Sequence, residues 1–306
     1  MTSAAAQSSD TPLFDPASPL KPTGNLRRRL FVSQAIRWGA IAAAAIAVGA
    51  LAIVTFDVIE EGASALNLDF IIKDPPAFGP GGGIRSAIIG TAIIVTAGAL
   101  IATPVGVLIA LYLVEFSSPR SRTARALRMT LDLMQGVPAI VVGIFVLGLI
   151  VEVQHKDSGF AGSVALAIIM LPLVARSSQE VLLLVPEGLR EASDALGVDR
   201  WRSILTVILP TAMSGILTGA ILALARAAGE TAPLLAVDGT FTPHLTFNWF
   251  GPMPNIPVSI WTAAEAADPN GFARAWGMAF VLLMLILLAN VGARLLFARS
   301  RRKVMG

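Results

Sequence analysis

Cysteine is absent from this chain of 306 residues, and histidine occurs only twice. Without cysteine the chain forms no disulfide and carries no thiol chemistry, so the redox compartment stays undefined. His155 and His244 lie far apart in polar stretches, which argues against a metal centre. No apolar segment holds a nucleophile, a base and an orienting group together, so we predict no catalytic residue, no cofactor and no enzyme.

Lysine is also scarce, and its four positions follow Leu20, Ile72, His155 and Arg302. A phosphate-binding P-loop needs a glycine directly before its lysine. The chain therefore lacks a P-loop, and any ATP-driven process that it takes part in must use a separate ATP-binding subunit.

Charged residues make up only 14% of the chain, whereas 55% of its residues are hydrophobic. Soluble domains carry about 25% charged residues. The mean hydropathy of +0.73 is too high for one soluble core, so we expect an all-α membrane protein.

Six uncharged windows approach or exceed the roughly 20 residues that a helix needs to cross a bilayer. These predicted spans are Trp38–Phe56, Ser86–Val114, Leu133–Val151, Ser158–Ala175, Ser203–Ala225 and Ala275–Ala293. The uncharged stretch 239–264 contains four prolines, so we interpret it as a long loop with interfacial aromatic residues. We expect residues 1–37 to be a disordered basic tail, residues 57–85 an extracytoplasmic loop, and residues 298–306 a second basic tail.

Basic residues alternate between the two ends of these spans. Eighteen of them fall in the segments before span one, after spans two and four, and after span six, against four on the other side. The positive-inside rule places the richer side, and with it both termini, in the cytoplasm. The net charge of +3 is thus explained by topology and gives no reason to expect nucleic acid.

The cytoplasmic segment between spans four and five predicts a short amphipathic helix over about 187–200. Leu189, Ala192, Ala195 and Leu196 share one face, acidic and basic residues occupy the other, and Gly197 is suited to end the helix. Amphipathicity alone is equally compatible with a helix docked in a partner's groove and with one lying among lipid headgroups.

The same segment resembles the EAA loop of bacterial ABC importer permeases. Glu191, Ala192 and Ser193, then Gly197, then residues 207–210 keep the spacing of that motif, with Ser193 in place of its second alanine and Val207 in place of isoleucine. The resemblance implies that this helix docks into a cleft of an ATP-binding subunit.

Two arginine–glutamate pairs at i,i+4 spacing lie in or beside the apolar windows: Arg176 with Glu180, and Arg226 with Glu230. An arginine at the centre of a spanning helix costs about 2.5–3.5 kcal/mol, so a partner or a watery cavity is expected. Three interpretations remain open. The arginines extend to the headgroups, the pairs are structural salt bridges, or they line an anion pathway, because guanidinium forms forked hydrogen bonds with oxyanions.

Three further stretches resemble the PstA family of phosphate-specific ABC transporter permeases. They are RAAGETAPLL (226–235), GGGIRSAIIGTAIIV (81–95) and GVPAIVVGIF (136–145). The resemblance implies a type I importer permease fold over residues 86–297, five common helices plus one N-terminal helix, in the plasma (inner) membrane of a prokaryote. It also implies a PstC-like permease partner, two copies of an ATP-binding subunit and an extracytoplasmic phosphate-binding protein. We predict a substrate pathway that consists of Arg226, Glu230, Arg176, Glu180, Thr231 and Ser177. The resemblance supports its part within residues 226–235, and the arginine–glutamate spacing suggests the rest.

Other functions remain as alternatives. These alternatives are a permease for another oxyanion, a PstC-type partner permease, an ATP-independent secondary anion transporter and an anion channel. A secondary transporter or a channel leaves the EAA-like loop unexplained, and the ending GETAPLL favours PstA over PstC, which shares only part of this signature.

Overall fold

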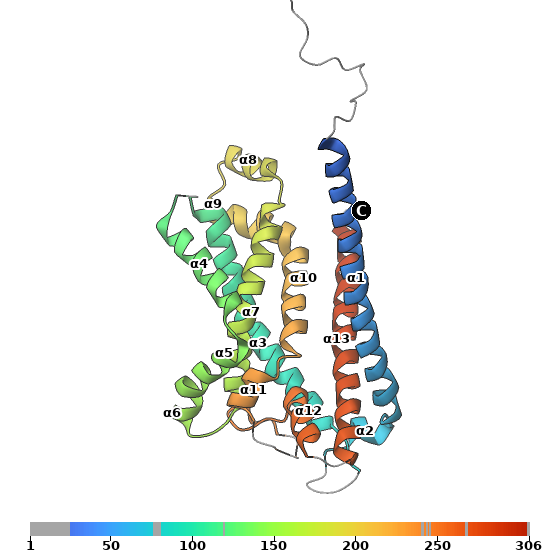
Figure 1. The fold of residues 1–306 in the computed structure, drawn as a ribbon. Helices are drawn as coiled ribbons and strands as arrows, with labels where there is room; N and C mark the ends of the chain where they lie inside the picture. Colours follow the sequence, from blue (N-terminus) through green and yellow to red (C-terminus); the bar gives the residue numbers. More distant parts are fainter. Residues whose placement is uncertain are drawn as a thin grey trace, which may run out of the picture. The chain divides into compact units, whose positions relative to one another are not determined.

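The computed structural model describes residues 25–75, 81–118, 120–239, 242, 244, 246–266 and 269–304. Within these residues all regular structure is helical, including three π-helical turns labelled η (Figure 1). The elements are α1 (Asn25–Ser64), α2 (Leu68–Ile72), α3 (Arg85–Leu111), η1 (Tyr112–Phe116), α4 (Arg122–Gly136), α5 (Ala139–Val146), η2 (Leu147–Val151), α6 (Glu152–Gln154), α7 (Gly159–Leu183), α8 (Glu187–Ala195), α9 (Arg200–Ser203), η3 (Ile204–Ile208), α10 (Leu209–Ala227), α11 (Ala232–Val237), α12 (Ile256–Glu265) and α13 (Pro269–Val304).

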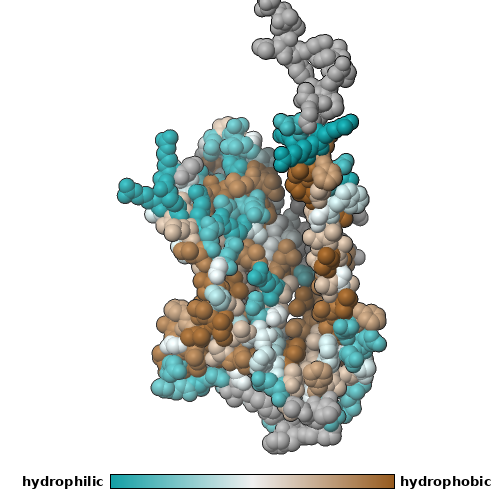
Figure 2. Space-filling view, viewed as in Figure 1, coloured by the Kyte–Doolittle hydropathy of each residue, from teal (hydrophilic) through white to brown (hydrophobic). Residues whose placement is uncertain are grey.

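Five helices are long and apolar enough to cross a membrane, or six when α4 and α5 with its continuation count as one bent span. The predicted all-α membrane fold is therefore confirmed. The helices overlap the predicted windows but extend beyond several of them, because a stretch of uncharged residues marks the apolar part of a span and not the ends of its helix. Figure 2 shows hydrophilic residues at the end where α4, α8 and α9 lie, and hydrophobic residues over the helices next to it.

The first helix starts earlier than its composition suggests. α1 is continuous from Asn25 to Ser64, so residues 25–37, assigned above to a disordered tail, are helical. Arginine and leucine are good helix formers, which lets the basic segment extend the apolar one. The rest of that predicted tail, residues 1–24, lies outside the described residues. Residues 1–56 and 57–306 form two separate compact units, and the site lies in the second.

The core of the second unit is the contact of α7 with α3 and α10 (Figure 1). Small residues let these helices approach closely. At Gly98 of α3, an added Cβ would lie 3.0 Å from the backbone oxygen of Ser163 on α7. At Gly219 of α10, an added Cβ would overlap the hydroxyl group of Ser177 on α7. The glycines let α3 and α10 approach α7 closely, and these contacts hold α7 at the centre of the unit.

The predicted third span, Leu133–Val151, is not one straight helix. Its chain breaks at Val137 and Pro138, and the helices on either side make an angle of 102°. Proline has no N–H to donate to the preceding turn and excludes its predecessor from the helical conformation, and Val137 is accordingly extended. Because of the bend, α4 and α5 run in different directions, and a cavity lies between them and α7.

The predicted loop 239–264 contains most of a helix, α12. The four prolines of this stretch led to the prediction of a loop, which is wrong for this part. Pro257 occupies the first turn of α12, where the missing N–H has no intrahelical partner in any case. The side chain of Asn255 caps the helix by accepting the N–H of Val258 at 3.0 Å. The Ile256 N–H donates to the hydroxyl group of Thr91 on α3 at 2.8 Å, so α12 is attached to the core.

The other segments assigned to loops or tails are partly helical too. The predicted extracytoplasmic loop 57–85 contains the last turns of α1 and the short helix α2. Gly62 in that part of α1 packs against Trp276 and Phe280 of α13. α13 itself continues to Val304, so most of the predicted C-terminal tail is helical.

Candidate functional site

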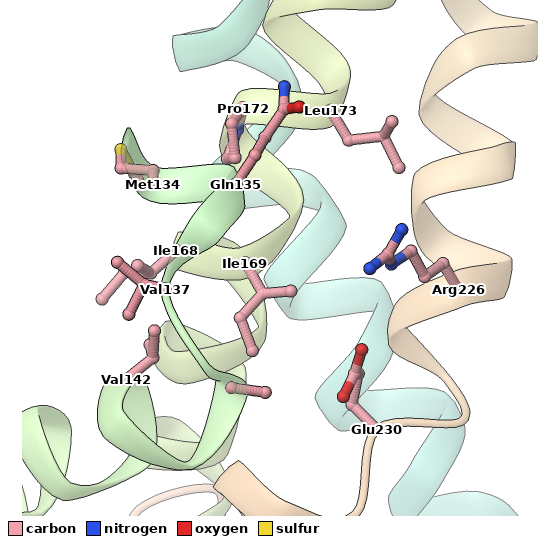
Figure 3. Close-up of a pocket in the computed structure, with 11 residues that line it drawn as sticks. Met134, Gln135, Val137, Val142, Ile168, Ile169, Pro172, Leu173, Arg226 and Glu230 are labelled. Atoms are coloured by element: carbon pink, nitrogen blue, oxygen red, sulfur yellow. The ribbon is translucent and has the colours of Figure 1, made fainter. Parts of the chain in front are cut away.

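A cavity of about 260 Å³ lies between the α4–α5 bend, the middle of α7 and the end of α10 (Figure 3). Most of its wall is apolar, and its polar residues are Gln135, Arg226 and Glu230. The complete lining is Met134, Gln135, Val137, Ala139, Val142, Ile168, Ile169, Pro172, Leu173, Arg226 and Glu230. A mainly apolar cavity with a few converging polar groups is the usual form of a small-ligand site.

Arg226 and Glu230 supply the two charges of this cavity. α10 ends at Ala227, and a turn carries the chain on, with the Gly229 N–H donating to the Arg226 carbonyl group at 3.2 Å and the Glu230 N–H to the Ala227 carbonyl group at 3.1 Å. Both side chains extend from the same wall into the cavity (Figure 3).

Neither of these side chains has a partner within the described part of the chain. No ion pair or hydrogen bond of the Arg226 guanidinium or of the Glu230 carboxylate is found among those residues, although the two are four positions apart. An arginine with all of its donors free in a largely apolar cavity is a binding group for an anion.

The second predicted pair does not form. Arg176 makes an ion pair with Asp132 on α4 instead of Glu180, and it also donates to the Arg128 carbonyl group at 3.5 Å. The physical reason is the crossing of α4 and α7, which brings a carboxylate of another helix within reach of the guanidinium. Arg176 therefore links α4 to α7 and does not line the cavity.

The remaining predicted pathway residues also lie outside the cavity wall. Ser177 faces α10 at the α7–α10 contact and donates to the Val174 carbonyl group at 3.1 Å. Glu180 is exposed on α7. Thr231 precedes α11, and its carbonyl group accepts the Leu235 N–H at 2.9 Å. Of the six residues, the structure brings only Arg226 and Glu230 together at the cavity.

The predicted docking helix is present as α8. Gly197 has a φ of +67°, so the expected left-handed residue at the helix end is confirmed. The Gly197 N–H donates to Asp194 at 3.0 Å and the Val198 N–H to Ser193 at 3.1 Å, the two bonds of a Schellman motif.

The faces of α8 differ in exposure. Glu191 and Ala192 are exposed, whereas Ser193 is buried. Leu196 at the helix end is also exposed, so the apolar face is free to meet a partner. Ser193 at the position of the motif's second alanine thus faces the protein interior.

Sequence reasoning missed the residues that the bend contributes. Gln135, Val137 and Ala139 surround the break at Pro138 and form one cavity wall. A glycine, a branched residue and a proline in succession within an apolar window were the available signal, because such a run interrupts a helix. Asp132, the partner of Arg176, had no local signal, since it lies 44 positions away along the chain.

A buried carboxylate occurs outside the spans, after α11. The Asp238 side chain accepts the Met253 N–H at 2.9 Å through Oδ1, while Oδ2 has no hydrogen-bond partner among the described residues. Burial raises the pKa of Asp238 to about 8, an increase that the Met253 hydrogen bond opposes and the neighbouring Asp157 carboxylate supports. Asp238 therefore holds a proton near neutral pH.

Comparison with known proteins places this architecture in a family. Residues 102–303 match the family described as binding-protein-dependent transport system inner membrane component. The phosphate transport system permease protein PstA of Pasteurella multocida is 38% identical over 251 residues, which cover 81% of this chain and 88% of that protein. The PstA protein of Haemophilus influenzae is 40% identical over 250 residues, 81% of this chain and 87% of that protein.

A solved structure supports the fold. A chain in the crystal structure of a bacterial alginate ABC transporter, in complex with a periplasmic protein that holds an alginate pentasaccharide, matches with a TM-score of 0.60 at 14% identity. The match covers 88% of this chain and 96% of that chain. At this identity the likeness concerns the arrangement of helices alone.

Members of this family are multi-pass inner membrane subunits of bacterial ABC importers, which work with ATP-binding subunits and periplasmic binding proteins. The chain, with its helical core, its amphipathic helix α8 and its charged cavity, belongs to the family of binding-protein-dependent transport system inner membrane components and, within it, to the PstA permeases.

Proposed function

We propose that this chain is a transmembrane permease subunit of an ATP-driven importer and that it passes inorganic phosphate across the membrane. The observation that carries the proposal is the cavity with the side chains of Arg226 and Glu230, neither of which has a partner among the described residues. The names of the relatives from Pasteurella multocida and Haemophilus influenzae support phosphate as the anion.

The two charges have complementary tasks in this proposal. Arg226 offers planar, forked donors that match two oxygens of a tetrahedral oxyanion. Glu230 offsets part of that attraction, because a lone arginine in a medium of low dielectric constant would hold an anion too strongly to release it. Phosphate near neutral pH still carries a proton and can donate it in a hydrogen bond to Glu230. Sulfate has no such proton and meets only repulsion from the carboxylate.

The other pathway residues are assigned to the route between the cavity and the cytoplasm. α7 carries Arg176, Ser177 and Glu180 beyond the cavity residues Pro172 and Leu173, on the side where α8 follows. In the conformation described here Arg176 is held by Asp132, so we propose that it meets the anion in another state of the transport cycle. Thr231 is assigned to the opposite end of the route.

The subunit composition follows the same proposal. A PstC-like permease completes the pathway, two copies of an ATP-binding subunit hydrolyse ATP, and one of them receives α8 through Glu191, Ala192, Ser193 and Gly197. An extracytoplasmic phosphate-binding protein delivers the anion. Both termini lie in the cytoplasm, in agreement with the distribution of basic residues. A reporter fused after Lys303 that proves extracytoplasmic would contradict this topology.

The experiment that tests the function is uptake of labelled phosphate by liposomes containing the complete complex, with and without ATP inside them. We expect uptake only with ATP and the binding protein. Uptake without ATP would indicate a secondary transporter or a channel instead.

Selectivity offers a sharper form of this test. In Glu230→Gln we expect sulfate to compete with phosphate about 10-fold better than in the wild type, because one charged hydrogen-bond acceptor and its repulsion are lost. Asp69→Asn is the matched control, since Asp69 is an exposed carboxylate that pairs with Lys73 and does not line the cavity. Unchanged sulfate competition in Glu230→Gln would exclude Glu230 as the selective group.

A further inference from the structure

Glu115 is a buried carboxylate at the end of a membrane-spanning helix. It lies in η1, the π-helical turn that continues α3, and only 3% of its side chain is exposed. A charge removed from water to this extent destabilises the fold unless a partner and further hydrogen bonds compensate it. The residue that compensates Glu115 therefore identifies the element to which the end of α3 is attached.

The partner is Arg190 of the docking helix α8. Its Nε and Nη2 atoms donate to the same Glu115 oxygen at 3.2 Å and 3.0 Å. Its Nη1 atom donates to the Val185 carbonyl group at 2.8 Å, and Nη2 also reaches the Leu182 carbonyl group at 3.0 Å. One guanidinium thus connects α8, the end of α7 and the end of α3.

The next residue, Phe116, contacts the other end of the docking segment, which comprises α8 and α9. Its ring packs edge-on against Trp201 of α9 with centroids 5.8 Å apart, and the Arg200 guanidinium lies 5.5 Å from the ring centroid. Glu115 and Phe116 are adjacent in sequence, yet one binds α8 and the other α9. The end of α3 is therefore attached to both ends of the docking segment, although the chain itself joins that segment to α7 and α10.

This attachment matters because α3 and α7 pack against each other along their length. Gly98 and Gly106 of α3 contact α7 so closely that an added Cβ at Gly106 would lie 2.9 Å from a methyl group of Val174. α7 also carries the cavity residues Ile168, Ile169, Pro172 and Leu173. If the ion pair between Glu115 and Arg190 stays intact, a displacement of α8 moves α3 and α7 together. The cavity wall on α7 then moves with them.

We propose that Glu115 and Arg190 form the rigid joint through which movement of the docking helix α8 is transmitted to α3 and α7 and so to the cavity. The proposal rests on the proposed function, in which an ATP-binding subunit moves α8. Glu115 is a positioning residue in this role, because it acts through Arg190 and does not contact the anion. Without the joint, α8 would move with the ATP-binding subunit while α3 and α7 lag behind.

The test is the number of ATP molecules hydrolysed per phosphate transported by the reconstituted complex. In Glu115→Gln we expect this ratio to rise by about 5-fold or more, with hydrolysis per assembled complex nearly unchanged and uptake reduced. Asp69→Asn, which breaks the exposed ion pair with Lys73, is the control and should keep the wild-type ratio. A purely structural role would lower the yield of complex without changing the ratio, and that result would overturn the proposal.

A double variant covers the case in which Glu115→Gln does not assemble. Glu115→Gln combined with Arg190→Gln leaves no uncompensated buried charge, so the fold should tolerate it better than either single change. The joint is still absent, and the raised ratio should persist. A wild-type ratio in the double variant would refute the joint.

A distance measurement keeps both joint residues intact. The chain has no native cysteine, so spin labels can be attached at Gly188→Cys on α8 and Ser118→Cys after η1. We expect the distance between the labels to stay constant between the nucleotide-free and ATP-bound complexes, whereas a change would show that the joint is not rigid. Absence of ATP-driven phosphate uptake by the wild type would instead count against the proposed function, so the two failures are distinguishable.

Discussion

Two segments of this protein contain the same local pattern, an arginine followed four residues later by a glutamate, and the fold uses them differently. On α7, Arg176 turns away from Glu180 and pairs with Asp132 of α4. At the end of α10, Arg226 and Glu230 remain unpaired within the described residues and face a cavity. The i,i+4 spacing permits an ion pair, but the neighbouring helices determine whether it forms.

The surroundings of each arginine explain the difference. α7 continues without a break through residues 176–180 and crosses α4, whose carboxylate lies within reach of Arg176. α10 stops at Ala227, and the side chains beyond it meet the apolar wall of the α4–α5 bend, which offers no charge. One arginine is therefore occupied as a link between helices, and the other is left available for a ligand.

The largest effect is expected at the unpaired arginine. Arg226→Gln should reduce phosphate uptake roughly 100-fold, the size expected when a forked, charge-assisted contact of about 3 kcal/mol is lost. Arg226→Lys should recover about a tenth of wild-type uptake, because an ammonium group lacks the planar fork. Uptake and assembly are measured on the same preparation.

A matched control separates loss of charge from loss of a binding group. Arg85 forms a partly exposed ion pair with Asp74 outside the cavity, so Arg85→Gln should transport normally. Full transport by Arg226→Gln would mean that Arg226 only extends to the headgroups, and the comparison between the two arginines would lose its functional meaning.

Asp238 adds a third environment to the comparison, a buried carboxyl group that forms no ion pair with a cation among the described residues. The raised pKa of about 8, against 3.8 for an ordinary aspartate, means that between about pH 4 and pH 8 the folded protein holds a proton that the unfolded chain releases. Stability should therefore fall as pH rises through this window, by at most about 1.4 kcal/mol per pH unit, and level off above pH 8.

Asp238→Asn tests this sign, because asparagine resembles the protonated acid at every pH. The melting temperature of the variant should exceed that of the wild type at pH 8 by several degrees, at about 2–4 °C per kcal/mol, and approach it at pH 5. A wild type whose melting temperature rises between pH 5 and pH 8 would show that the carboxylate is ionised in the fold.

The smallest effect is expected at the paired arginine. Asp132 and Arg176 are both partly exposed, with 63% and 29% of their side chains accessible, so their ion pair should contribute only about 0.3–1 kcal/mol. A double-mutant cycle with Arg176→Gln and Asp132→Asn, read from thermal unfolding, measures this coupling. A cycle with Glu180→Gln in place of Asp132→Asn should give no coupling, and a coupling to Glu180 would contradict the pairing described here.

Composition and local pattern determined much of this protein. Uncharged stretches located the spans, because a helix in lipid has few alternatives to apolar side chains. Gly197 marked the end of α8, because a left-handed residue favours glycine. The predicted span Ser203–Ala225 ends close to the end of α10 at Ala227. Each of these properties depends on residues close together in the chain.

Only the tertiary structure decided which charges are paired. Arg176 meets Asp132 across 44 positions, and Glu115 meets Arg190 across 75, through helix crossings that no local pattern encodes. The bend at Pro138 was readable as an interruption, but the cavity that it opens depends on where α7 and α10 pass. Local sequence determines the conformation of a segment, whereas the partner of a buried charge depends on how segments pack, because the desolvated group is compensated by whichever helix lies against it.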